Sequence, residues 1–266
     1  MLKEKDSSFT PRLVALDIDG TLVDNFGDLP GDVRRAVGRV VATGTPVVLS
    51  TGRSWLATKP IFEDLGLPDG WVVSSNGAMV LKYSPLDIVF EERFDPAPTI
   101  AKIRDRVPEA RIAVQDGLNW RVSRPFPDGE LQGDVTVEPV EELMSRPVGR
   151  VVLRDPGTPE EEFRAKVGDL GLHEVSYFIG WSAWLDIAPQ GIDKAHGLQR
   201  VVDDLGIHAS DVLAIGDGRN DIEMLTWAGR GVAMGNAEDD VVAVADHVTG
   251  TFNDGGVVEE LLRWFR

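Results

Sequence analysis

One stretch near the start of the chain reads Leu13-Val14-Ala15-Leu16-Asp17-Ile18-Asp19-Gly20-Thr21. Its short, continuous apolar run is typical of a strand buried on both faces of a parallel sheet. Asp17 and Asp19 then stand at the carboxyl end of that strand, the edge at which open α/β sheets bind ligands. Two like charges so close are costly to ionise unless a cation or hydrogen bonds compensate them. The stretch therefore predicts a metal site; the alternative is an ordinary acidic turn, because Asp and Gly are common turn residues.

The composition is typical of a globular protein and excludes several classes of site. Hydrophobic residues make up 42% and charged residues 27% of the chain, enough to form a core and a solvated surface. The absence of cysteine excludes disulfides, thiolate ligands and cysteine nucleophiles. The net charge of −17 argues against a nucleic-acid partner. We find neither a membrane-length apolar run nor a signal peptide, and we expect a cytoplasmic protein with no membrane partner.

The pattern of a buried strand followed by a polar turn recurs along both ends of the chain. Strands are predicted at residues 13–16, 46–49, 71–73, 211–215, 231–236 and 247–249. Helical spacing of apolar residues lies between them, notably over 33–41, from Lys194 to 205, and over 257–265. This alternation predicts an α/β fold with a doubly wound parallel sheet.

The middle of the chain has a different pattern. Alternating strands are predicted at residues 88–94, 111–115, 118–122, 148–153, 175–179 and 184–188, with helices at 97–107 and 158–170. Such alternation suits an antiparallel sheet with one face covered. Prolines 85 and 189 flank the region. We therefore expect a core domain of residues 1–84 and 191–266, with residues 85–190 inserted as a second α/β domain.

Polar residues follow several predicted core strands, and a parallel sheet brings such strand ends to one edge. Carboxylates there suit a hard cation such as Mg²⁺, which prefers oxygen ligands. Threonine, lysine and backbone amides at helix N-termini suit phosphate. A carboxylate beside them could act as a nucleophile and form an acyl phosphate that water hydrolyses.

Four segments, in this order, resemble the motifs of the haloacid dehalogenase superfamily: Asp17-Ile18-Asp19-Gly20-Thr21, Ser50-Thr51-Gly52-Arg53, Lys194 and Gly216-Asp217-Gly218-Arg219-Asn220-Asp221. The insertion between the second and third motifs, with Ser75-Asn76-Gly77-Ala78, is similar to the Cof-like phosphatases with a type C2 cap. The resemblance covers nearly the whole chain. It implies a Rossmann-like core with an α/β cap, and a Mg²⁺-dependent phosphatase of small phosphorylated metabolites, such as sugar phosphates, that forms an aspartyl phosphate.

The resemblance also implies a role for each motif residue. Asp17 would be the nucleophile, and Asp19 would protonate the leaving oxygen and then activate water. Mg²⁺ would be held by Asp17, the backbone carbonyl of Asp19 and Asp217, with Asp221 either as a further ligand or as a support for the other ligands. The phosphoryl group would be bound by Thr51, Gly52, Lys194 and Asn220. The rest of the substrate would contact Asn76 and Arg53.

Structural alternatives exist for these residues, and two related functions stay open. Thr51 could cap the next helix, and Lys194 could be a solvated surface lysine. A receiver-type signalling domain shares the acidic cluster but is much shorter and lacks a large insertion, so the length argues against it. A phosphosugar mutase or a non-catalytic binder of phosphorylated ligands would use similar residues. The sequence indicates neither the individual substrate nor the oligomeric state.

Overall fold

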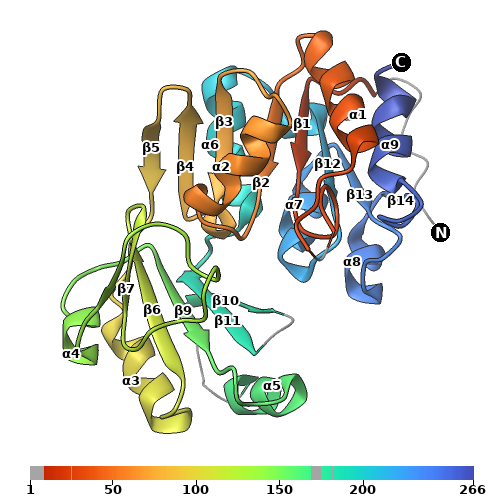
Figure 1. The fold of residues 1–266 in the computed structure, drawn as a ribbon. Helices are drawn as coiled ribbons and strands as arrows, with labels where there is room; N and C mark the ends of the chain where they lie inside the picture. Colours follow the sequence, from red (N-terminus) through yellow and green to blue (C-terminus); the bar gives the residue numbers. More distant parts are fainter. Residues whose placement is uncertain (1–8, 25, 169–174, 181–182) are drawn as a thin grey trace. The chain divides into compact units, whose positions relative to one another are not determined.

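The computed structural model describes residues 9–24, 26–168, 175–180 and 183–266 (Figure 1). The described residues form two compact units. The first, the core unit, lies within Met1–Arg53, Thr58–Phe90 and Asp193–Arg266. The second, the inserted unit, lies within Ser54–Ala57 and Glu91–Ile192.

The described part of the core unit contains an 8-stranded sheet with β1 near its centre. In sheet order the strands are β14 (His247–Val248), β13 (Arg230–Ala233), β12 (Val212–Gly216), β1 (Leu13–Leu16), β2 (Val47–Ser50), β3 (Gly70–Ser74), β4 (Met79–Tyr83) and β5 (Asp87–Glu91). The strands from β14 to β3 are parallel, and β4 is antiparallel to β3. Because the chain winds outward from β1 in both directions, the predicted doubly wound α/β fold is confirmed.

Helices cover both faces of the core sheet, which explains why β1 is apolar throughout. They are α1 (Gly31–Ala42), α2 (Trp55–Asp64), α6 (Lys194–Leu205), α7 (Ile222–Trp227), α8 (Asp239–Val244) and α9 (Gly256–Trp264). Leu198 of α6 and Leu225 of α7 pack with Leu13 and Ala15 on one face. Helices α1, α2 and α9 lie on the other (Figure 1). No helix of the described residues is long and apolar enough to cross a membrane.

The inserted unit is a mixed α/β structure of its own. Its described strands form a sheet in the order β10 (Val175–Gly180), β11 (Trp184–Pro189), β9 (Arg150–Arg154), β6 (Arg111–Asp116), β7 (Asn119–Val122) and β8 (Val135–Val137). Neighbours are antiparallel except β7 and β8. Helices α3 (Ala97–Arg106), α4 (Val140–Leu143) and α5 (Glu160–Gly168) pack on one face around Ile103, Leu143 and Phe163. Residues 169 and 170 of the helix predicted at 158–170 lie outside the described residues.

The strand predicted at residues 88–94 belongs to a different sheet from the one expected. Asp87–Glu91 forms β5 at the edge of the core sheet, and its residues up to Phe90 belong to the core unit. Phe90 packs against the core, and the guanidinium carbon of Arg200 lies 3.5 Å from the centroid of its ring. The alternating pattern thus did not indicate which sheet the strand joins, and it did not predict burial either, because Ile88 and Val89 are both exposed.

Candidate active site

The carboxyl ends of the central core strands bring the predicted residues together. Asp17 follows β1, Thr51 follows β2 and Asp217 follows β12. Leu16, the last residue of β1, lies opposite residues of both neighbouring strands, so the three side chains start from adjacent positions. Connections leave β1 and β12 in opposite directions, and such a switch point is where sheets of this class bind ligands.

Lys194 is the buried cation of the site. It is the first residue of α6, whose N-cap is Asp193: the Asp193 carboxylate accepts a hydrogen bond of 2.8 Å from the His196 N–H. The Lys194 Nζ donates to Asp17 Oδ1 and to Asp221 Oδ1, both at 2.6 Å. Burial lowers the pKa of Lys194, but the two carboxylates raise it by more, so the net pKa is raised and the ammonium stays charged.

Three carboxylates lie close together at this edge of the core sheet. Asp17, Asp217 and Asp221 each present an oxygen within 4.8 Å of the others. Burial and the neighbouring Asp221 raise the pKa of Asp17 well above its ordinary value, against the opposing effect of Lys194. Burial and Asp221 also raise the pKa of Asp217, to about 7. When all three carboxylates are ionised, the single ammonium leaves a deficit of two positive charges, and this all-oxygen donor set fits a divalent cation.

The turn after β12 holds the Asp221 carboxylate through backbone hydrogen bonds. Asp221 Oδ2 accepts hydrogen bonds from the N–H groups of Asp217 at 3.1 Å and Gly218 at 2.9 Å. Gly216 has to lack a side chain here, because a Cβ would lie 2.4 Å from the Asp221 carboxyl carbon. The glycine-rich motif is therefore explained by close approach of backbone to the acidic cluster.

Asn236 contacts the cluster but was not predicted as a site residue. Its Nδ2 donates to Asp217 Oδ2 at 2.9 Å and to the Gly20 carbonyl at 3.2 Å. Its Oδ1 accepts from the Phe252 N–H at 2.8 Å. Asn236 follows β13, the next parallel strand. This position after a strand was the sequence feature that could have identified it as a site residue. The amide therefore orients Asp217 from a neighbouring loop.

The Asp19 side chain lies apart from the three clustered carboxylates. It is 59% exposed and forms a bidentate ion pair with Arg53, with Nε to Oδ2 at 2.9 Å and Nη2 to Oδ1 at 2.5 Å. The Arg53 N–H donates to the Thr51 hydroxyl at 3.1 Å, which ties the arginine to the turn after β2. Two parallel bonds fix the plane of the carboxylate as well as its position.

Asn76, Asn220 and Gly52 form the remaining part of the site. The Asn220 side-chain amide donates to Asn76 Oδ1 at 2.9 Å. Asn76 is buried in a left-handed conformation (φ 53°), and its N–H donates to the Thr51 carbonyl at 3.0 Å. A Cβ on Gly52 would lie 3.2 Å from Asn76 Oδ1, so this backbone approaches the amide closely. The structure thus places every predicted site residue at one edge of the core unit; their chemical roles are still predictions.

Gly77 positions this edge against the start of α6, and its replacement should be costly. Its φ is +92°, and a Cβ would lie 1.9 Å from the Asp193 carbonyl oxygen. Gly44 is a matched control, with φ +79° and no atom within 4 Å of the same Cβ position. We expect Gly44→Ala to lower the free energy of unfolding by about 1–2 kcal/mol through backbone strain alone. Gly77→Ala should lose clearly more in urea denaturation, and equal losses would contradict the clash.

Comparison with known proteins identifies the family to which this chain belongs. Residues 14–261 match the haloacid dehalogenase-like hydrolase family. The chain therefore belongs to the haloacid dehalogenase-like hydrolases, as its motifs predicted.

Individual relatives indicate which members of this family the chain is similar to. The chain is 28% identical to the 5-amino-6-(5-phospho-D-ribitylamino)uracil phosphatase YitU of Bacillus subtilis, over 96% of this chain and 98% of that protein. It is 29% identical to the pyridoxal phosphate phosphatase YbhA of Escherichia coli, over 91% and 94% of the two chains. A solved phosphatase of the same superfamily from Bacteroides thetaiotaomicron superposes with a TM-score of 0.79 at 26% identity, covering 98% of each chain. Within its family, the chain is similar to phosphatases of the Cof-like type.

Proposed function

We propose that this protein hydrolyses phosphate monoesters of small metabolites with Mg²⁺, through an aspartyl phosphate on Asp17. The observation that carries the proposal is the cluster of Asp17, Asp217 and Asp221 at the switch point of the core sheet, with the buried Lys194 bonded to two of them. A structural ion-pair network would need matching charges, whereas this one has an excess of carboxylate. The relatives named as phosphatases support the same reaction class.

The metal would be held by the side chains of Asp17, Asp217 and Asp221 and by the backbone carbonyl of Asp19. When bound, Mg²⁺ neutralises charge on the phosphoryl group and orients it for in-line attack. Asn236 keeps an Asp217 oxygen in place through its 2.9 Å bond, so one of the proposed ligands is oriented before metal binding.

The phosphoryl oxygens would be bound by Lys194, the Thr51 hydroxyl, the Gly52 N–H and Asn220. A lysine ammonium has three donors, and Lys194 uses two of them on Asp17 and Asp221. The third is available for a phosphate oxygen beside the nucleophile. Donors fixed in a buried site stabilise transferring charge more strongly than donors in water.

The reaction would have two steps. An Asp17 oxygen attacks phosphorus, the bond to the ester oxygen breaks, and Asp19 donates a proton to that leaving oxygen. Asp19 then takes a proton from water, which attacks phosphorus, releases inorganic phosphate and regenerates the Asp17 carboxylate. Arg53, through its bidentate pair, would orient the Asp19 carboxylate and contact the substrate.

Small phosphorylated metabolites are the proposed substrates. Relatives act, by their names, on 5-amino-6-(5-phospho-D-ribitylamino)uracil and on pyridoxal phosphate. The narrower expectation of sugar phosphates rests on the sequence resemblance, and like the cytoplasmic location it stays a prediction. A panel of phosphorylated sugars, nucleotides and cofactors, assayed for phosphate release, tests the class, and no turnover on any member would refute it.

Removal of metal should stop hydrolysis. The ionised cluster of Asp17, Asp217 and Asp221 has two more negative charges than Lys194 balances. Without a cation, this cluster should repel an anionic substrate. We expect EDTA to abolish phosphate release, Mg²⁺ to restore it, and Ca²⁺ to restore little, because its larger and looser coordination suits in-line geometry less well. Undiminished activity in metal-free buffer would contradict the metal assignment.

Asp19→Asn should separate the two steps. Loss of a general acid and base lowers rates by about 10²–10⁴-fold, and we expect that loss for ordinary alkyl esters. Acetyl phosphate has a good leaving group, so it should still phosphorylate Asp17, and the phosphoenzyme should persist. Asp28→Asn, which changes another exposed carboxylate of the core unit, is the control. Normal turnover of alkyl esters by Asp19→Asn would show that its assigned role is wrong.

A further inference from the structure

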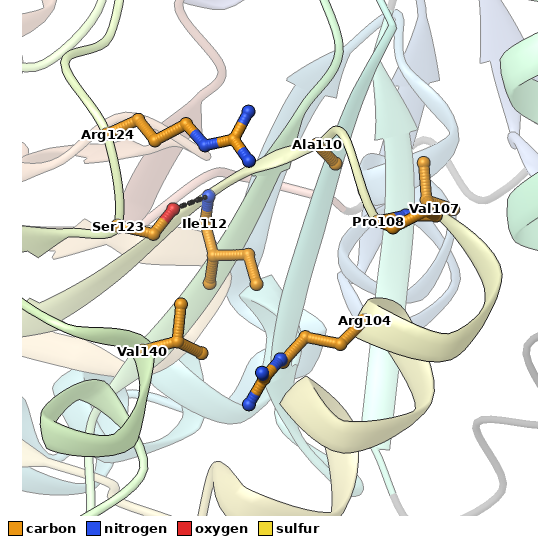
Figure 2. Close-up of a pocket in the computed structure, with 8 residues that line it drawn as sticks. All are labelled: Arg104, Val107, Pro108, Ala110, Ile112, Ser123, Arg124 and Val140. Carbon is orange, nitrogen blue, oxygen red and sulfur yellow. Dashed lines mark hydrogen bonds between the residues drawn. The ribbon is translucent and has the colours of Figure 1, made fainter.

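A cavity in the inserted unit is lined by none of the residues proposed for catalysis. It has a volume of about 310 Å³, at the lower end of the range for small-molecule sites. Its lining comes from the end of α3, the start of β6, the residues after β7 and the start of α4 (Figure 2). None of these residues belongs to the proposed active site, so the reaction leaves the cavity without a role.

The floor of the cavity is apolar and built from the core of the inserted unit. Val107, Ala110 and Ile112 are almost fully buried and belong to the main hydrophobic cluster, against which Val140 also packs. A floor made of core residues is already in place before a ligand arrives. Apolar contact there would therefore require little rearrangement of the protein.

Two arginines from different elements border this floor. Figure 2 shows Arg124 and Arg104 extending past opposite sides of the Ile112 side chain. Arg104 pairs with Glu141 at 3.1 Å and Arg124 with Glu109 at 3.3 Å, and these glutamates are 71% and 82% exposed. Exposed ion pairs of this kind contribute only about 0–1 kcal/mol. A ligand anion can replace either glutamate at small cost.

Ser123 adds a third donor to the cavity. Its Oγ accepts a hydrogen bond of 2.9 Å from the Ile112 N–H, which fixes the oxygen (Figure 2). That bond uses a lone pair and leaves the hydroxyl hydrogen to donate. The side-chain groups that the cavity offers are thus two guanidinium groups and a hydroxyl over an apolar floor, in a chain whose net charge is −17. This donor set is complementary to a small organic anion.

We propose that this cavity is a second ligand site, which binds a small organic dianion. The apolar body of the ligand would lie on Ile112 and Val140, and its two acidic groups would pair with Arg104 and Arg124. The Ser123 hydroxyl would donate to one of them. The proposal does not depend on the reaction proposed for the core unit.

Terephthalate is a suitable probe, because it has a flat apolar body with a carboxylate at each end. Binding to the full chain is measured by isothermal titration calorimetry, with benzoate and uncharged benzamide as comparisons. We expect saturable binding in the order terephthalate, benzoate, benzamide. Arg104→Gln and Arg124→Gln should each weaken terephthalate about tenfold, the loss of one charge-assisted contact.

Two controls make the result decisive. Arg106→Gln removes an arginine of the same helix that is 59% exposed, pairs with Asp105 and does not line the cavity, so binding should be unchanged. Asp17→Asn should also leave binding unchanged, which keeps this test independent of the catalytic proposal. No saturable binding, equal affinity for benzamide, or an equal loss in Arg106→Gln would overturn the site.

Discussion

Asp17→Asn should abolish phosphate release while leaving the fold intact. The side-chain amide cannot attack phosphorus, and removal of a covalent nucleophile lowers kcat by orders of magnitude, to about 10⁶-fold in a well-studied protease. We expect a loss of at least about 10⁴-fold and no phosphoenzyme in rapid-quench experiments.

The same variant should not be less stable than the wild type. Burial raises the pKa of Asp17, which means that the folded protein disfavours its charged form. The neutral Asn has the same shape, and its Oδ1 can still accept the hydrogen bond from Lys194. Urea denaturation without metal should therefore give an equal or higher midpoint. Near-wild-type turnover, or a folded variant that still forms phosphoenzyme, would refute Asp17 as the nucleophile.

Lys194→Met should damage both stability and activity. The ammonium is fully buried between Asp17 and Asp221, so its loss leaves two buried carboxylates without their cation. Breaking a buried ion pair on one side destabilises by about 3–5 kcal/mol. Activity should fall as well, since the proposed phosphate donor is lost. Both effects are measured on the purified variant, by urea denaturation and by phosphate release.

Lys59→Met is a matched control for Lys194→Met, because the two lysines form ion pairs of the same length. Lys59 pairs with Glu63 at 2.6 Å, as Lys194 does with its carboxylates, but its side chain is 38% exposed. Exposed pairs contribute about 0–1 kcal/mol, so this variant should stay close to the wild type in stability and activity. Similar losses of stability and activity in Lys59→Met and Lys194→Met would mean that burial of the lysine does not determine the size of these losses.

The sequence was sufficient to predict which residues meet, because a parallel sheet has a single carboxyl edge. Asp17, Thr51 and Asp217 each follow a short apolar run, and this position brings them together. Asn236 follows a similar run, but asparagine is also a common turn residue. The local pattern therefore did not show whether Asn236 is a site residue or an ordinary turn residue. The raised pKa of Asp217 could not be predicted either, because it depends mainly on burial by distant segments.

Short elements were the main part of the fold that sequence patterns missed. Strand β8 has three residues, all exposed, and helix α4 has four, too few for a period to be visible. Such elements depend on tertiary contacts more than on local propensity. The strand predicted at residues 88–94 was assigned to the wrong sheet, because its partner β4 was not predicted.

The pairing of β1 has a consequence for synthesis on the ribosome. Leu13 pairs with Val212, and Asp17 and Lys194 are 177 positions apart, whereas β6 pairs with β7 and β9 nearby in the chain. Domains fold as units while the chain emerges, and local contacts form first. The inserted unit can therefore fold while one side of β1 still lacks its partner strand. The nascent chain acquires the cation of its buried acidic cluster only after that unit is made, so an interrupted chain has no assembled site.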